Sequence, residues 1–250
     1  MLREHMKKFY SPSSTVACFC GSFDREKIIL LCKRFFGSPA STDELPPLSK
    51  AEFCTGVHIF DKKTEQNQIA IGFSAPSLES DSRFACQLIA SMLGGSASSR
   101  LFRRLREEQG LVYSVDAGAM SFLSAGVFAV TMGVSRESEK KAVLAAAEVL
   151  REFPDTVTEN ELDLARSHYL SGLIMSLESN SVRASRYGTG ELLLGGAISE
   201  KELEEKIRNI GIDEVRTLAR SFSSLSDACI CAVGKTAGTK FYNKVVSAGK

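Results

Sequence analysis

The sequence is poor in histidine, and this shortage limits the metal chemistry that the chain can carry. Only His5, His58 and His168 occur in 250 residues, and no two of them lie within one helical turn of each other. A helix-borne catalytic zinc site needs two ligands about one turn apart and a third ligand elsewhere. The sequence therefore predicts that no residue of this chain binds a metal ion, and each histidine is interpreted as a structural or surface residue.

Other signals are also missing. No apolar run approaches the roughly 20 residues that a membrane-spanning helix needs, and the basic N-terminus lacks the apolar stretch of a secretory signal. A formal net charge of +1 gives no reason to expect nucleic acid or a membrane surface as a partner. The Gly-x-Ser-x-Gly turn of serine hydrolases is absent. We expect a globular protein of the cytoplasm or of an organelle matrix.

The seven cysteines include no Cys-x-x-Cys pair. Cys18 and Cys20, like Cys229 and Cys231, are two residues apart in apolar runs, so each pair would share one face of a strand. We interpret the cysteines as free thiols that serve as small core residues, which suits a reducing compartment.

The chain is expected to divide into three parts. Residues 1–36 are predicted to form a helix, a strand over 15–20 and a second helix that Asp24 caps. Residues 37–50 hold three of the six prolines and are interpreted as a linker. Residues 51–250 would form one larger domain.

Apolar periodicity predicts the elements of this larger domain. The expected strands cover 53–60, 68–75, 111–118, 124–133 and 228–233. The expected helices cover 81–93, 98–109, 137–153, 158–175, 178–194, 200–208, 212–221 and the last few residues. Thr158 and Glu161 have the spacing of a capping box, and Gly110 is a candidate helix C-cap.

One order of elements occurs twice. A helix, a serine-rich turn, an apolar strand with Cys-x-Cys, a glycine and another helix are expected near residues 2–35 and again near 212–248. This repetition predicts that residues 1–36 are the tail of one module and that residues 51–250 are a second copy of it.

Two stretches could carry chemistry. The loop from Gly94 to Ser99 (GGSASS) could expose backbone amides to an anion, but it lacks the lysine of a phosphate-binding loop. The alternative is a turn between helices, with glycine for positive φ and serine as a cap.

The second stretch links a helix end to a strand start. Arg106 lies in the last helical turn, and Tyr113 is expected to share a strand face with Leu111 and Val115. A guanidinium and a phenol brought together in this way could bind a carbonyl or carboxylate. The alternative is an arginine that complements the helix dipole and a tyrosine in the core.

The motif of residues 93–115, LGGSASSRLFRRLREEQGLVYSV, strongly resembles the signature in the C-terminal half of pitrilysin/insulinase-type zinc peptidases, which include the mitochondrial processing peptidase. The resemblance extends to residues 66–72, Pro76, and residues 155–162, 178–179 and 187–188. Residues 6–36 resemble the end of the family's N-terminal half. The resemblance implies an α+β half-domain in which a mostly antiparallel sheet packs against helices.

The family also implies a division of labour. Its N-terminal half carries a His-x-x-Glu-His zinc motif, which this sequence lacks, so zinc is expected only in a partner half or subunit and the chain is expected to be inactive alone. By resemblance, Tyr113 would donate to the scissile carbonyl, and Arg106 would hold the peptide or the tyrosine. The substrate-contacting residues would be Gly94, Gly95, Ser96, Ser98 and Ser99.

Three hypotheses remain open at this point. The chain is a substrate-binding, non-catalytic half of a zinc endopeptidase, a structural subunit without a peptidase role, or a truncated product without function. The partners expected for the first are a peptide or protein substrate and a zinc-bearing half. A homodimer would bring two zinc-free faces together.

Overall fold

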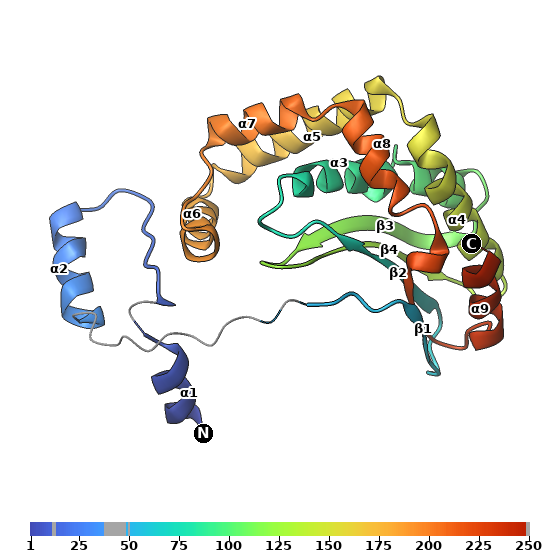
Figure 1. Cartoon of the computed structure of the whole chain (residues 1–250), viewed down its shortest axis with the longest axis horizontal. Helices are drawn as coiled ribbons and strands as arrows, with labels where there is room; N and C mark the ends of the chain where they lie inside the picture. The colour runs from blue at the N-terminus through green and yellow to red at the C-terminus, as the bar shows by residue number, and fades with distance from the viewer. Residues whose placement is uncertain (12–13, 38–48, 50, 249–250) are drawn as a thin grey trace. The chain divides into compact units, whose positions relative to one another are not determined.

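The computed structural model describes residues 1–11, 14–37, 49 and 51–248 (Figure 1). The chain forms two compact units, Met1–Ser49 with Leu170–Glu204 and Lys50–Tyr169 with Glu205–Lys250. The helices are α1 (Leu2–Phe9), α2 (Arg25–Phe36), α3 (Ser82–Gly94), η2 (Phe102–Glu107), α4 (Glu139–Thr156), α5 (Glu159–Ser176), α6 (Asn180–Leu194), α7 (Glu200–Asn209), α8 (Ile212–Arg220), η3 (Leu225–Asp227) and α9 (Thr239–Ala248). The strands are β1 (Gly56–Phe60), β2 (Asn67–Ala75), β3 (Val112–Ser121), β4 (Gly126–Val134) and β5 (Cys229–Val233).

The larger unit is built on one five-stranded sheet with the order β1-β5-β2-β4-β3. Only β1 and β5 run parallel, while the other three pairs of neighbours are antiparallel. The predicted α+β class, with a mostly antiparallel sheet packed against helices, is therefore confirmed.

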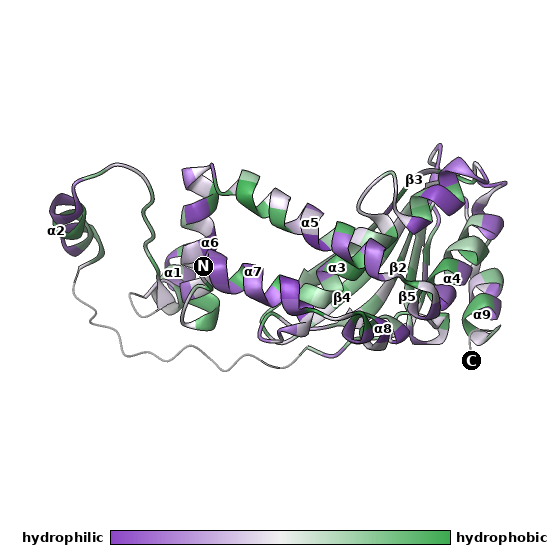
Figure 2. Ribbon diagram, turned by 90° about the horizontal axis from the view of Figure 1, so that it is seen from above, coloured by the Kyte–Doolittle hydropathy of each residue, from purple (hydrophilic) through white to green (hydrophobic). Residues whose placement is uncertain are grey.

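One face of this sheet forms the core. Ile69, Ile71 and Phe73 alternate along β2 with more exposed residues, and all three are buried. Phe73, Phe128 and Phe222 form an aromatic cluster in which the rings of Phe128 and Phe222 stack at 4.5 Å. Helix α3 packs on β3 and β4, and α8 packs on α3 and α4. Figure 2 shows the mixed polar and apolar faces expected of such covering helices, for example on α4.

A buried carboxylate ties the end of the chain to this sheet. Glu139 at the start of α4 accepts hydrogen bonds from Asn67 Nδ2 at 2.9 Å and from the Tyr242 hydroxyl at 2.6 Å. The backbone N–H of Ala237 also donates to it, at 2.9 Å. These donors satisfy a group that would be costly to bury alone, and they fix the turn that follows β5.

The cysteines are free but are not mainly core residues, so that part of the prediction is wrong. Only Cys86 is buried, and burial raises the pKa of its thiol to about 12. Cys229 and Cys231 are half-buried because Ile230 and Ala232 take the core-facing positions of β5. A strand that is covered on one face can bury only every second residue.

The two N-terminal helices form as predicted, and Asp24 caps α2 by accepting from Lys27 N at 3.1 Å. The strand expected over 15–20 does not form within this chain, where these residues pair with no described strand. A strand needs a hydrogen-bonded neighbour, and this segment instead lies along α6, where Cys20 Sγ contacts Asn180 Oδ1 at 3.6 Å.

The expected linker, residues 37–50, lies mostly outside the described residues. The division of the chain at 36 and 51 therefore stays a prediction. In the described part of the chain, no helix is both long and apolar enough to cross a membrane.

The repeated element order is visible in the backbone. Gly21 has φ 136° and precedes α2, and Gly234 has φ 133° and precedes α9. Few side chains tolerate such angles, so both glycines serve the same kind of turn between an extended segment and a helix. The difference is that β5 lies between two strands, whereas residues 15–20 have no ladder.

Candidate functional site

The site predicted from sequence begins at a helix with an unusual backbone. Residues Phe102–Glu107 form a π-helix, a conformation that is rare and often found at functional sites. The C-cap of this helix is Glu108, and Gly110, with φ 59°, follows two residues later, where Leu111 N donates to Leu105 O at 2.8 Å. The candidate cap at Gly110 therefore lies two residues beyond the observed cap and forms the turn into β3. The chain enters β3 only two residues later, so Arg106 and Tyr113 are brought close together.

Tyr113 lies in a β-bulge. The register pairs Val112 with Val134 and Ser114 with Gly133, which leaves Tyr113 without a partner on β4. Val112 and Val115 are buried, whereas the side chain of Tyr113 is 56% exposed. The expected shared face of Tyr113 and Val115 is therefore wrong, as is the alternative of a core tyrosine. The extra residue shifts the alternation and turns the phenol toward solvent.

Arg106 is directed at the backbone of the same bulge. Its Nη1 donates a hydrogen bond to the carbonyl oxygen of Tyr113, and its guanidinium lies 5.3 Å from the centre of the Phe102 ring. The guanidinium therefore holds the peptide unit that carries the tyrosine. The phenol itself stays available for another molecule.

The Gly94–Ser99 segment joins α3 to the π-helix and crosses close to the sheet. A Cβ on Gly94 would overlap the backbone nitrogen of Ala117 in β3, and a Cβ on Gly95 would lie 2.9 Å from Ser91 Cα. Neither glycine has a positive φ, so the expected reason for them is wrong. They allow close approach instead of an unusual turn.

The serines of this segment differ in their surroundings. Ser96 and Ser98 are exposed, and their hydroxyls lie 3.0 Å apart. Ser99 is only 3% exposed, and its hydroxyl has no hydrogen-bond partner. No serine side chain caps the helix that follows, which corrects the capping alternative.

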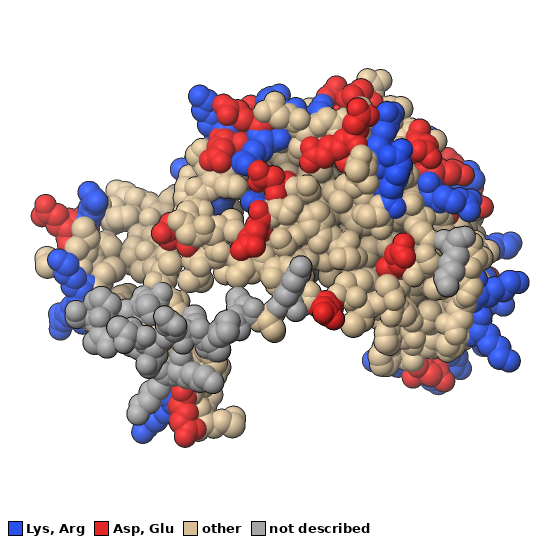
Figure 3. All heavy atoms as spheres, viewed as in Figure 1, with Lys and Arg blue, Asp and Glu red and all other residues tan. Residues whose placement is uncertain are grey.

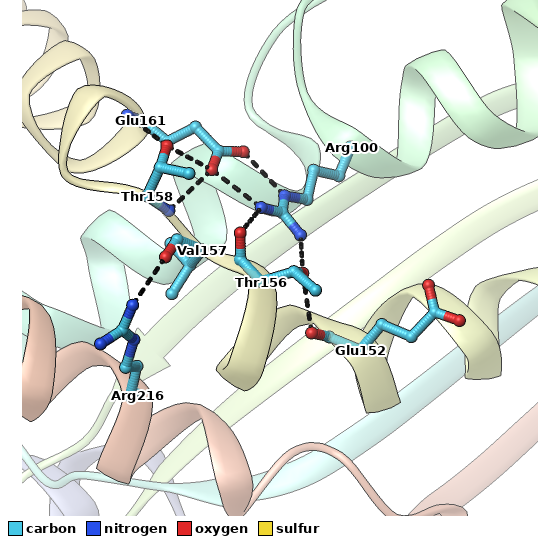
Figure 4. Close-up of polar contacts among 7 residues, drawn as sticks. All are labelled: Arg100, Glu152, Thr156, Val157, Thr158, Glu161 and Arg216. Atoms are coloured by element: carbon cyan, nitrogen blue, oxygen red, sulfur yellow. Dashed lines mark hydrogen bonds and ion pairs between the residues drawn. The ribbon is translucent and has the colours of Figure 1, made fainter.

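Arg100 fixes the end of the segment (Figure 4). Its Nε donates to Glu161 Oε1 at 2.7 Å and its Nη2 to Glu161 Oε2 at 2.8 Å. It also reaches the hydroxyl of Thr156 at 2.5 Å and packs over the ring of Phe153 at 5.1 Å. One planar side chain thus joins the loop to the turn between α4 and α5.

Glu161 completes the predicted capping box. Its carboxylate accepts from Thr158 N at 2.9 Å, and Thr158 Oγ1 accepts from Glu161 N at 3.3 Å. Burial opposes ionisation of Glu161, but the hydrogen bonds from Arg100 and Thr158 outweigh it and hold the pKa of this carboxyl below its ordinary value. The carboxylate is therefore charged and matched by Arg100 at neutral pH.

A cavity of about 190 Å³ lies between the end of α3, residues 96–99 and α5. Its α5 wall is formed by Glu161, Leu164, Ala165 and His168. From sequence, His168 is interpreted only as a structural or surface residue, and nothing predicts that α5 lies beside the loop. The spacing of these four residues, which puts them on one helical face, was the available signal.

The remaining candidate sites are limited. Among the residues that the structure describes, no three His, Cys, Asp or Glu side chains are placed to share a metal ion. Acidic and basic side chains are mixed on the face that Figure 3 shows.

Comparison with known proteins places this geometry in a family. A family profile described as the peptidase M16 inactive domain matches residues 1–169. The zinc protease YmxG of Bacillus subtilis (strain 168), described as uncharacterized, is 30% identical over 220 residues, or 88% of this chain and 54% of the relative. A zinc protease of Rickettsia bellii is 29% identical over 94% of this chain and 58% of its own length. The chain thus spans somewhat over half the length of these curated relatives.

Solved structures share the fold. A chain of complex III2 from Candida albicans matches with a TM-score of 0.79 and 19% identity, over 92% of this chain and 57% of that one. A peptidase M16 inactive domain from Pseudomonas fluorescens matches with a TM-score of 0.72 and 19% identity, over 87% and 52%. The resemblance predicted from residues 93–115 is confirmed, and this chain belongs to the peptidase M16 inactive-domain family.

Proposed function

We propose that this chain is the substrate-binding, zinc-free half of an M16-type metalloendopeptidase and that it acts only with a zinc-bearing half. The observation that carries the proposal is the pairing of Arg106 with Tyr113. The phenol is 56% exposed, while its own peptide carbonyl is held by the guanidinium. An exposed hydroxyl on a restrained peptide unit is suited to donate to a peptide carbonyl that becomes an oxyanion.

The chain would not supply the nucleophile. Its sequence has no His-x-x-Glu-His, so the zinc ion, the activated water and the general base would come from the partner half. In that complex Tyr113 would stabilise charge as it develops, and Arg106 would be a positioning residue. A homodimer of this chain would lack the same groups and would stay inactive.

The N-terminal segment supports the need for a partner. Val16, Phe19 and Phe23 are between 38% and 47% exposed, and α2 has no buried residue. Gly21 and Gly234 have similar positive φ angles. We infer from this that residues 15–20 add a strand to a sheet of the partner half, as β5 is inserted between β1 and β2 here. Burial of these apolar side chains would favour association.

The substrate would be an extended peptide or protein segment. Gly94, where the Gly94–Ser99 loop begins, closely approaches Ala117 of β3, the strand that also carries Tyr113. Exposed Gly95, Ser96 and Ser98 would offer backbone and hydroxyl groups to the peptide. All seven cysteines are free, which is in keeping with a reducing compartment such as the cytoplasm or an organelle matrix.

The test is reconstitution. The purified chain is mixed with a separately expressed, His-x-x-Glu-His-bearing polypeptide from the same genome, and cleavage of fluorescently labelled casein is followed. We expect cleavage only in the mixture and its loss with EDTA. Casein cleavage by the chain alone, or stoichiometric zinc in the purified chain by elemental analysis, would contradict the proposal.

A structural subunit without a peptidase role is the second candidate. The fold match to a chain of complex III2 favours keeping it in view. A scaffold needs the same fold but not the Tyr113 hydroxyl. A stable complex with the zinc-bearing polypeptide, without cleavage and without any effect of Tyr113→Phe on assembly, would support this second function.

A further inference from the structure

The cavity beside the Gly94–Ser99 loop contains an unsatisfied polar group. Ser99 is 97% buried, because only 3% of it is exposed, and its Oγ has no hydrogen-bond partner. Native proteins rarely leave a buried hydroxyl unpaired, since its lost contact with water costs about 1–3 kcal/mol. Ser99 also lines the cavity of about 190 Å³. An occupant of the cavity could supply the missing partner.

The walls of the cavity are apolar on two sides. Met92 from α3 and Ala165 from α5 are buried, with exposures of 7% and 4%. Leu164 is 62% exposed, so it offers apolar surface that an occupant would cover. These side chains favour an occupant whose body is apolar.

The one carboxylate that lines the cavity is already paired, so it does not require a cationic occupant. The carboxylate of Glu161 is already paired with Arg100 through two hydrogen bonds of 2.7 and 2.8 Å. Ser96 and Ser98 pair with each other at 3.0 Å. Among the serines of the Gly94–Ser99 loop, only Ser99 has no hydrogen-bond partner in the described contacts. Its hydroxyl is therefore left to bind a neutral polar group at the end of an occupant.

We propose that this cavity binds a neutral side chain with an apolar body and a hydroxyl tip, and that tyrosine of a peptide substrate is its natural occupant. The cavity of about 190 Å³ is somewhat larger than an apolar cavity of about 150 Å³ that admits benzene, so an aromatic ring fits in it. A phenol can both donate to and accept from Ser99 Oγ. The identity of the occupant as part of a peptide rests on the function proposed above.

The test uses phenol and benzene as probes of the full-length chain. Their binding is followed by NMR through the Met92 methyl group and the backbone amides of Ser99 and Ala165. We expect phenol to shift these signals in the millimolar range and to bind about fivefold more tightly than benzene, as one added hydrogen bond predicts.

Two variants separate the hydroxyl from the cavity. Ser99→Ala should remove the preference for phenol, whereas Ser98→Ala should retain it, because Ser98 already has a partner. Ala165→Phe should fill the cavity and block both probes, and circular dichroism checks that each variant is folded. Equal binding of phenol and benzene to the wild-type chain, or shifts that map away from the cavity, would overturn the proposal.

The outcome is independent of proteolysis, because the probes need no zinc-bearing partner. If phenol binds as expected but no mixture cleaves casein, the proposed function fails and the pocket stands. If casein is cleaved but phenol does not bind, the pocket proposal fails alone. If both succeed, Ser99→Ala should raise KM for a tyrosine-containing peptide relative to its phenylalanine analogue and leave kcat unchanged.

Discussion

The guanidinium of Arg106 donates a hydrogen bond to the backbone carbonyl of Tyr113, seven residues along the chain. This contact joins the end of a π-helix to a bulged residue at the start of β3. The bulge directs the phenol outward, and the arginine restrains the peptide unit beneath it. Because Tyr113 presents the hydroxyl and Arg106 only restrains the backbone, we expect substitutions of the two residues to affect kcat to different extents.

Tyr113→Phe should lower kcat of the reconstituted peptidase about 100-fold, on the scale of losing one oxyanion donor. KM for the peptide should change little, since the ring remains. The measurement is steady-state cleavage of a fluorogenic peptide by the mixture. Tyr10→Phe, a matched change at a tyrosine that is 69% exposed, should have no effect on kcat. Full turnover by Tyr113→Phe would remove the proposed role of the hydroxyl.

Arg106→Lys should lower kcat about tenfold, because a lysine lacks the planar fork and reaches the Tyr113 carbonyl less well. Arg103→Lys, on the exposed part of the same helix, is the control and should behave like the wild type. The deuterium exchange rates of amides 113 and 114 provide an independent readout, and they should rise only in Arg106→Lys. Normal kcat together with faster exchange would show that the contact is structural alone.

Gly94→Ala should destabilise the fold by about 2–3 kcal/mol, since an added Cβ overlaps the backbone of Ala117 and forces α3 away from β3. Gly118→Ala is the control on β3, next to Ala117. Its added Cβ meets nothing within 4 Å, so it should lower the free energy of unfolding by less than about 1 kcal/mol. Urea denaturation of both variants gives the comparison. Equal stability of the two would contradict the close approach of α3 to the sheet.

Glu161→Gln should destabilise the chain by about 1–2 kcal/mol at neutral pH, a modest figure because the side chain is 33% exposed. The pKa of Glu161 is held below its ordinary value, so its stabilising effect is present above about pH 4.3 and is lost as the pH falls through the lower folded pKa. The difference in unfolding free energy between wild type and Glu161→Gln should therefore shrink on acidification to about pH 3.

Glu159→Gln in the same first turn of α5 is the control for this pH series, because it removes one charge near the same helix N-terminus. Its difference from wild type should stay small at every pH. If the Glu161→Gln difference does not depend on pH, the ion pair with Arg100 does not contribute to stability.

Most elements of the fold could be predicted because their signals are local. The period of apolar residues, the cap at Asp24 and the box formed by Thr158 and Glu161 each depend on residues within about one turn. Strand order could not be predicted in this way. The insertion of β5 between β1 and β2 depends on pairing between residues roughly 160 to 170 positions apart.

The resemblance names residues for the candidate site but gives no geometry for them. The resemblance pointed to Arg106, Tyr113 and the glycine-serine loop, yet the bulge at Tyr113 reverses its expected face. The cavity could not be predicted from the loop alone, because four of its nine lining residues come from α5. A sequence pattern records which face of α5 is apolar but not which loop that face meets.

The position of β5 also determines when the sheet can form during synthesis of the chain. β1 and β2 leave the ribosome early, but the strand that joins them is translated about 150 residues later. Until then β1 has no partner in the sheet and one edge of β2 is unpaired, and unpaired strand edges are prone to pair with other molecules. Folding of this domain should therefore be slow and late, and chaperones that shield strand edges should improve its yield.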